Sequence, residues 1–341
     1  MFESSIEVYG LRKVGSRLRN FVKRFAELVS NEMQSAPSVQ GAPSNQQVEQ
    51  NPFWHYQCAF DAQATMARYA APELMPSAKF LTNYLGVKID PRFFPQILMG
   101  RENTVETMPQ PNNWHADIAE FAAALRAVDL AGPTFTVLEL GCGWGCWLNN
   151  TGAAARRAGK SVKLLGVEGD LGHVGFAKTS LVTNGYKPKE YEILHGVAAA
   201  TSGKALFPKQ PVPGLAWGLE PLFGAKQDQI DKALRDETHY CLEMIGLGEI
   251  VHRHGKLDLL HIDIQGGEAD FVSDSIELCN SFVRYIVIGT HSRVIEGTLE
   301  KLLLAHGWIL EVDRPAIVQL QDSKQILRVD GVQGWKNPRK I

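Results

Sequence analysis

Closely spaced glycines follow an apolar segment in the middle of this 341-residue chain. Residues 137–140 read Val-Leu-Glu-Leu, and glycines follow at positions 141, 143 and 145. Glycine lets the backbone turn sharply and approach a ligand closely, so this turn suits a nucleotide-like ligand. A dinucleotide fingerprint would need its third glycine at position 146, which is Cys146. The spacing therefore disfavours an NAD-dependent dehydrogenase; the alternative to ligand binding is a purely structural loop.

A carboxylate follows the next apolar segment of the chain. Glu168 and Gly169 come directly after residues 162–167. A carboxylate at a strand end can accept hydrogen bonds from both ribose hydroxyls of an adenosine. NAD enzymes place an acid similarly, so Glu168 indicates adenosine binding without identifying the cofactor. The alternative is an acid that is simply solvated at the end of a strand.

A second group of polar residues follows residues 257–262. Asp263 ends this apolar segment, Glu268 follows a Gly-Gly turn, and His291 ends the next apolar segment. One hypothesis makes His291 a general base that Asp263 orients or assists, because histidine titrates near neutral pH. A second hypothesis has Asp263, Glu268 and His291 bind a divalent cation such as Mg²⁺ or Mn²⁺. We favour the first, since sequence alone does not assure three ligands. The alternative roles are a structural histidine and a carboxylate that caps a helix.

Alternating strands and helices from residue 134 onward must position these residues. Such alternation predicts an α/β fold with a parallel sheet that is covered by helices on both faces. Ligands of these sheets bind at the carboxyl ends of the strands, where all the residues above are expected. Strands are expected at 135–140, 162–167, 191–195, 257–264, 283–288, 308–312 and 325–329. Helices are expected at 153–158, 171–184, 230–235, near 250, and at 269–279 and 297–306.

The chain before residue 131 has a different character. Apolar residues at three- and four-residue steps, with basic residues among them, predict an amphipathic helix over 1–30. This helix either touches a membrane surface or partner, or packs on the protein's own body or a second subunit. Residues 31–52 predict a flexible linker, and residues 53–130 a mainly helical region. Within that region, His115 and Asp117 either only start a helix or, as the family resemblance described below implies, cover a bound cofactor.

Composition excludes several classes of protein. The chain has 35 Lys plus Arg against 37 Asp plus Glu, and this near-neutral balance disfavours a nucleic-acid partner. No apolar run approaches the about 20 residues that span a bilayer, and no secretory signal is visible. Five scattered cysteines fit neither a zinc site nor a disulfide framework. We therefore expect a cytoplasmic protein with reduced cysteines.

The glycine turn, Glu139 and Glu168 together resemble the class I methyltransferases that use S-adenosylmethionine. Asp263-Ile-Gln-Gly-Gly-Glu268 and His291 are similar to the FkbM family of that class, over about residues 114–339. The resemblance implies a Rossmann-like, mostly parallel seven-stranded sheet with an N-terminal helical extension. It implies that the cofactor contacts Glu139, Gly141, Cys142, Gly143, Trp144, Glu168, Gly169, Val197, Ala198 and Asp263.

The resemblance also implies a reaction class. FkbM-like enzymes mostly methylate hydroxyl groups, so the expected acceptor is a glycan or a small natural product. Deprotonating such a hydroxyl calls for a base or a metal, and His291 with Asp263 is the expected catalytic pair. The rival hypothesis is a cofactor-binding, non-catalytic module that uses its N-terminal helix to bind a partner or a membrane. Self-association through residues 1–30 is a further open alternative.

Overall fold

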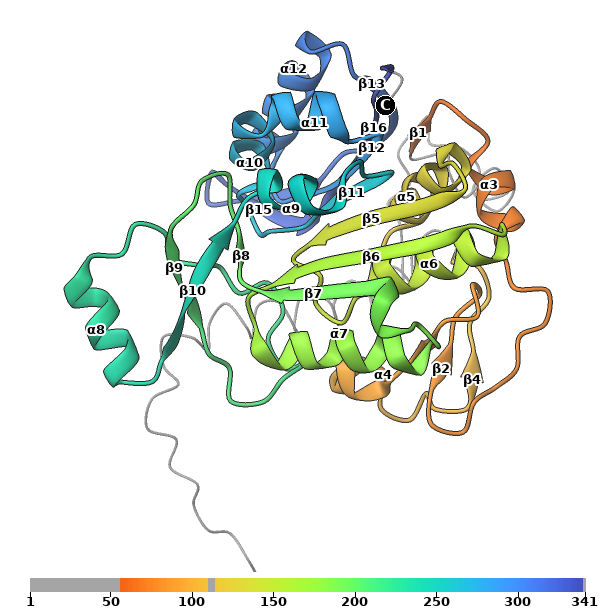
Figure 1. The fold of residues 1–341 in the computed structure, drawn as a ribbon, viewed down its shortest axis with the longest axis horizontal. Coiled ribbons are helices and arrows are strands. Elements are labelled where there is room, and N and C mark those ends of the chain that lie inside the picture. Colours follow the sequence, from red (N-terminus) through yellow and green to blue (C-terminus); the bar gives the residue numbers. More distant parts are fainter. Residues whose placement is uncertain (1–55, 110–113, 340–341) are drawn as a thin grey trace, which may run out of the picture. The chain divides into compact units, whose positions relative to one another are not determined.

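An eight-stranded sheet runs through the structure, in the order β1-β13-β16-β12-β11-β5-β6-β7 (Figure 1). Strands β12, β11, β5, β6 and β7 are parallel, whereas β16 runs antiparallel to β12 and β13, and β1 antiparallel to β13. The predicted α/β fold with a mostly parallel sheet is confirmed. The strands are β1 Gln57–Cys58, β5 Thr134–Leu140, β6 Ser161–Glu168, β7 Tyr191–His195, β11 Leu259–Ile262, β12 Tyr285–Thr290, β13 Ile309–Arg314 and β16 Gly331–Lys336.

This computed structural model describes residues 56–109 and 114–339. The predicted helix over 1–30 and linker over 31–52 lie outside the described residues. Among those described, no helix is both long and apolar enough to cross a bilayer. All five cysteines are free thiols in this structure.

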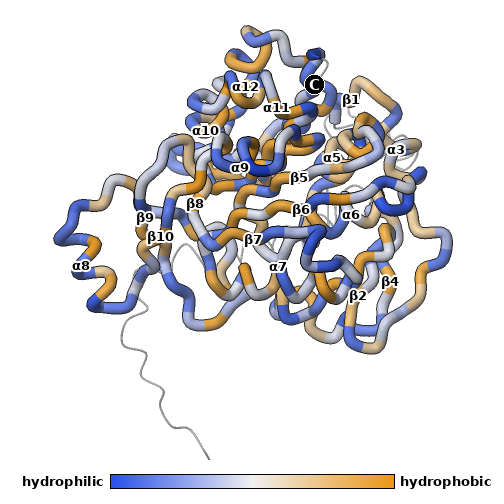
Figure 2. Tube along the Cα trace, viewed as in Figure 1, coloured by the Kyte–Doolittle hydropathy of each residue, from blue (hydrophilic) through white to orange (hydrophobic). Residues whose placement is uncertain are grey.

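Helices cover both faces of the sheet. Successive strand residues point to opposite faces, and apolar side chains on each face pack against helices. Phe135 and Val137 of β5 belong to one hydrophobic core, and Leu138 and Leu140 to the other. The first core includes residues of α3, α5, α6 and α7, and the second includes residues of α9 to α12. The central strands consist largely of hydrophobic residues, whereas hydrophilic residues dominate α8 (Figure 2). The helices are α3 Ala62–Arg68, α4 Pro95–Leu98, α5 Ile118–Leu130, α6 Cys146–Arg157, α7 Leu171–Thr183, α8 Gln227–Arg235, α9 Leu247–His254, α10 Glu268–Asp274, α11 Ile276–Phe282 and α12 Arg293–Ala305.

The strand order reverses beside β5, and this reversal locates the site. From β5 the chain passes through α6 to β6 on one side, whereas β11 pairs with β5 on the other side. The carboxyl ends of β5 and β11 therefore flank a switch point, where ligands of open α/β sheets bind. The glycine turn follows β5, and Asp263 follows β11.

Several elements differ from the prediction. The sheet has eight strands rather than seven because the two-residue β1 pairs with its edge. The expected helix over 269–279 is divided at Ser275 into α10 and α11. Residues 53–130, predicted to be mainly helical, also contain a small sheet of β2 Leu81–Thr82, β3 Lys88–Ile89 and β4 Thr104–Val105.

Short or exposed strands were the hardest elements to predict, since their apolar residues do not form long runs. Two further sheets are separate from the main one, and the sequence predicted only one of their strands, β15, at 325–329. One orders β8, β10 and β9, and the other is a hairpin of β14 and β15. Their bounds are β8 Val197–Ala198, β9 Lys204–Pro208, β10 His239–Ile245, β14 Ile317–Gln321 and β15 Lys324–Val329.

Candidate active site

The glycine turn after β5 fits tightly between the two neighbouring strand ends. The amide groups of Gly141 and Cys142 donate to the carbonyl of Val167, at 3.0 and 3.1 Å. A Cβ atom on Gly141 would lie 2.1 Å from the backbone carbonyl oxygen of Asp263, and Gly141 has a φ of +74°. Only glycine combines this left-handed conformation with so close a backbone approach. The turn therefore brings the chain after β5 into direct contact with the chain after β11.

Glu139 anchors the start of helix α6. The N-cap of this helix, Gly145, has no side chain to accept from the first-turn amides. Glu139 takes that role from the neighbouring strand, and its two oxygens accept from the backbone amides of Trp147 (3.2 Å) and Leu148 (3.0 Å). Burial raises the pKa of Glu139 to about 8, against the lowering effect of these hydrogen bonds. Glu139 thus has a structural role in addition to the cofactor contact predicted for it.

Glu168 links the ends of β6 and β5. Its Oε2 accepts from the amide of Gly143 at 2.8 Å, and its Oε1 accepts from the amide of Asp170 at 2.8 Å. Each carboxylate oxygen can accept more than one hydrogen bond, so this side chain can still bind further donors. Burial raises the pKa of Glu168 to about 7, while the backbone hydrogen bonds favour the charged form. The predicted ribose-binding carboxylate therefore lies directly against the glycine turn.

Other predicted cofactor residues are placed by the core. Cys142 and Trp144 are buried in the core. Val197 and Ala198 are also buried, and they pair with β10. Gly169 lies against the ring of Phe207, which a Cβ atom at position 169 would approach to 2.5 Å.

Trp217 covers the glycine turn, and the sequence pattern did not single it out. A Cβ atom on Gly143 would lie 2.7 Å from the Trp217 ring. This ring stacks on His173 (centroids 3.9 Å apart) and on Phe94 (4.2 Å). Trp217 belongs to the Pro- and Gly-rich segment 208–224, whose composition indicates only a loop. The segment thus forms an aromatic wall beside the turn.

Asp263, Glu268 and His291 converge at the same edge of the sheet. Nδ1 of His291 lies 2.9 Å from Oε1 of Glu268, and Nε2 lies 3.4 Å from Oδ1 of Asp263. Glu268 also accepts from the amides of Ile264 (3.2 Å) and Gly266 (3.0 Å). The structure brings these three residues together as the positions of β11 and β12 in the sequence predicted.

The charges in this cluster do not match the predicted role of His291 as a general base. Burial lowers the pKa of His291, but the hydrogen bond to Glu268 and the charge of Asp263 outweigh it and raise the pKa to about 10. Partial desolvation raises the pKa of Asp263 to about 6, although its side chain is 42% exposed. In this arrangement His291 carries a proton at neutral pH, so it is a cation held between two acids rather than a free base.

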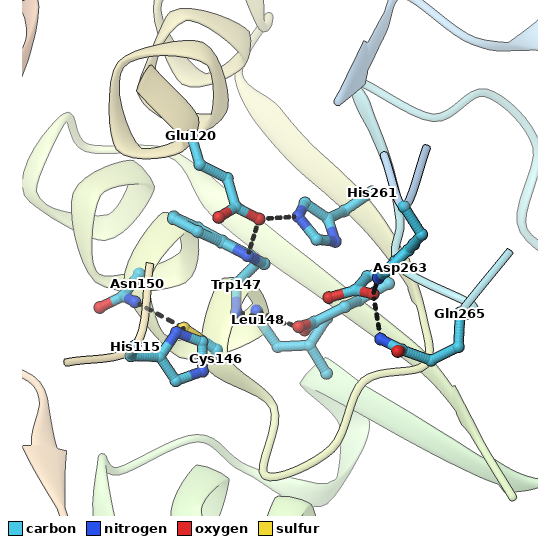
Figure 3. A network of polar contacts seen from close by, with 11 residues as sticks. His115, Glu120, Cys146, Trp147, Leu148, Asn150, His261, Asp263 and Gln265 are labelled. Atoms are coloured by element: carbon cyan, nitrogen blue, oxygen red, sulfur yellow. Dashed lines mark hydrogen bonds and ion pairs between the residues drawn. The ribbon is translucent and has the colours of Figure 1, made fainter. Parts of the chain in front are cut away.

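A buried network behind the cluster includes two residues to which no function was assigned from sequence (Figure 3). Glu120 of α5 accepts from Nε1 of Trp147 at 3.1 Å and lies 2.8 Å from Nε2 of His261. His261 precedes Asp263 by two residues on β11 and pairs with Glu139 of β5, so it shares a face with both. The signal in the sequence is one histidine inside an otherwise apolar strand.

His115 and Asp117 have separate roles. Asp117 caps helix α5, because its carboxylate accepts from the amide of Ala119 at 2.9 Å. This agrees with the helix-start alternative. His115 lies 3.6 Å from the Cys146 thiol and packs edge-on against Trp144, and burial lowers its pKa to about 4. His115 is therefore a neutral imidazole beside the start of α6.

Comparison with known proteins adds one informative relative. A protein of Jannaschia sp. (strain CCS1) named "Putative methyltransferase" is 45% identical over 274 residues, which covers 80% of this chain and 98% of the relative. No protein-family model matches the chain.

Solved structures match only weakly. Methyltransferase FkbM from Methylobacillus flagellatus KT matches with a TM-score of 0.39 and 10% identity, over 85% of this chain and 96% of that one. Human methyltransferase 10 domain containing protein matches with a TM-score of 0.36 and 14% identity, over 68% of this chain and 87% of that one. At these TM-scores neither likeness carries an argument about this chain.

Proposed function

Because the chain belongs to the methyltransferase family of its Jannaschia relative, we propose that it transfers a methyl group from S-adenosylmethionine to a hydroxyl group. The hydrogen bond between Gly143 and Glu168 carries this proposal, since it joins the glycine turn and the ribose-binding carboxylate at the switch point. Both features are needed for an adenosine cofactor, and both lie at the edge where such sheets bind ligands.

The residues at this edge fit the cofactor. Glu168 can accept from two ribose hydroxyls while it keeps its backbone hydrogen bonds. The turn from Gly141 to Gly143 offers close backbone approach, and Trp217 borders it with an aromatic surface. The bound cofactor supplies a methyl group that the positive sulfonium has already activated. We assign cofactor contacts to Glu139, Gly141, Cys142, Gly143, Trp144, Glu168, Gly169, Val197, Ala198 and Asp263.

The chain must also position and deprotonate the acceptor. Alignment of the acceptor oxygen can supply much of the rate acceleration, because the donor needs no further activation. Asp263 and His291 lie next to the turn, where the backbone carbonyl of Asp263 abuts Gly141. We propose that Asp263 and His291 together position and deprotonate the acceptor hydroxyl. His291 holds the Asp263 carboxylate in place through its charge.

Two features of the sequence support a particular class of acceptor: the FkbM-like motif and the net charge of the chain. Asp263, Glu268 and His291 keep the spacing of the FkbM-like motif. We therefore propose a glycan or a hydroxylated small molecule as the substrate, in a cytoplasmic protein with reduced cysteines. The near-neutral charge of the chain supports a small acceptor over a nucleic acid.

Calorimetry followed by an activity screen tests this function. We expect S-adenosylmethionine and S-adenosylhomocysteine to bind the full chain and NAD⁺ not to bind. A mass-spectrometric screen of glycans and hydroxylated metabolites should then yield a methylated product. His291→Ala should bind S-adenosylhomocysteine and lose turnover, and Asp263→Asn should also lose turnover, whereas His254→Ala, which changes a contact with Glu192 outside the site, should keep both binding and turnover. If neither cofactor form binds, the methyltransferase proposal is wrong.

A further inference from the structure

Three possible metal ligands come from three different elements at the carboxyl edge of the sheet. Asp263 follows β11, Glu268 is the first residue of α10, and His291 follows β12. Each offers one ligand atom, and these atoms all lie within 4.8 Å of one another. Two carboxylates and an imidazole are ligands that Mg²⁺, Mn²⁺ and similar divalent cations accept. The described part of the chain contains no other such group.

Hydrogen bonds within the cluster hold these side chains in place. Oε1 of Glu268 accepts from two amides of the loop that precedes α10, and Nε2 of Gln265 donates to Oδ1 of Asp263 at 2.9 Å. Gln265 has a positive φ of 60°, a conformation uncommon for a non-glycine residue. Groups that orient first-shell ligands in this way are typical of metal sites.

One atom of the cluster is left without a partner. The Glu268 side chain is 0% exposed, and its Oε2 has no hydrogen-bond partner in the described structure. A buried carboxylate oxygen without a partner is costly. The histidine contact does not relieve this cost, since it uses Oε1. A cation bound by both oxygens of Glu268 would satisfy Oε2 as well.

The site is closed on one side and open on the other. Glu268 is fully buried, whereas the Asp263 side chain is 42% exposed. A cation held there would keep coordination positions on the Asp263 side for water or for an oxygen of an acceptor. This asymmetry distinguishes a catalytic arrangement from a closed structural one.

From this geometry we propose that Asp263, Glu268 and His291 form a divalent-cation site that takes an oxygen of the acceptor as a further ligand. The cation-binding part stands independently of methyl transfer. The acceptor part rests on the proposed function.

Mn²⁺ binding to the full chain, stripped with chelator, tests the site. Electron paramagnetic resonance measures free Mn²⁺, and we expect one Mn²⁺ per chain that Mg²⁺ displaces. Asp263→Asn and His291→Ala should each weaken binding about tenfold or more. His254→Ala is the matched control, because its imidazole pairs with Glu192 at 3.1 Å outside the cluster, and it should bind as the unaltered protein does.

The outcomes separate this proposal from the proposed function. A Kd weaker than about 1 mM for Mn²⁺ in the unaltered protein overturns the cation site, as does equal binding by the cluster variants. Circular dichroism, measured on the same samples, shows whether each variant is folded, and S-adenosylhomocysteine binding is measured on the unaltered protein. Failure to bind S-adenosylhomocysteine would count against the proposed function and leave the Mn²⁺ result standing.

Discussion

The affinity for the cofactor should rise with pH, and Glu168 should be the reason. Ribose hydroxyls donate to a carboxylate, so binding requires the ionised form of Glu168. Burial raises the pKa of this carboxyl group to about 7 in the free protein, against an ordinary value of 4.5. At acidic pH the group is therefore protonated before binding and must release its proton when the cofactor binds.

The size of the effect follows from this pKa. At pH 6 about one molecule in eleven carries the carboxylate, and at pH 8 about ten in eleven do. The Kd for S-adenosylhomocysteine should therefore fall about tenfold from pH 6 to pH 8, which corresponds to ~1.4 kcal/mol. Calorimetry in buffers of different ionisation enthalpy should also detect release of a proton at pH 6.

The variant Glu168→Gln removes this titration and supplies the control. It should bind more weakly, and its Kd should change less between pH 6 and pH 8. Burial raises the pKa of Glu139 to about 8, but Glu139 is present in both proteins. The difference between their slopes therefore belongs to Glu168. A flat Kd in the unaltered protein, or an equal slope in the variant, refutes this reasoning.

Two substitutions test the packing that positions the site. Gly141→Ala should lower the free energy of unfolding, measured by urea titration, by more than about 2 kcal/mol, because its Cβ would lie 2.1 Å from the backbone carbonyl oxygen of Asp263. Gly132→Ala is the control, and it should change the free energy of unfolding little because the space around Gly132 is open. Asp117→Ala should lower the free energy of unfolding by about 3–5 kcal/mol, because it leaves the buried guanidinium of Arg314 without the carboxylate that now lies 3.0 Å from it. Thermal or urea unfolding measures the change, and a loss below about 1 kcal/mol would contradict a buried ion pair.

The alternating strands and helices of the main sheet could be predicted from local sequence patterns. Apolar runs located β5, β6, β11 and β12, because buried parallel strands read as continuous apolar segments. The short strands β2, β3 and β4 could not be found this way, since two residues carry no period. Helices α10 and α11 read as one segment, and their division at Ser275 depends on tertiary packing.

The order of the strands along the chain was enough to predict which residues lie at the carboxyl edge of the sheet. Glu168 ends one strand, Asp263 and His291 each follow another, and parallel strands place their carboxyl ends at one edge. That rule needs only the order of elements, so the proximity of Asp263 and His291 was predictable. The charge of His291 was not, because its pKa depends on how closely Glu268 approaches it in space.

Tertiary structure alone decided what surrounds these residues. Glu120 reaches His261 from a helix 141 positions earlier in the chain, and Trp217 covers Gly143 from a loop without a motif. The burial of Glu268, which leaves one of its oxygens without a partner, likewise results from the packing around α10. Sequence spacing constrains neighbours along one element or one sheet edge. Contacts between distant segments, and the desolvation they impose on charges, exist only once the whole core has packed.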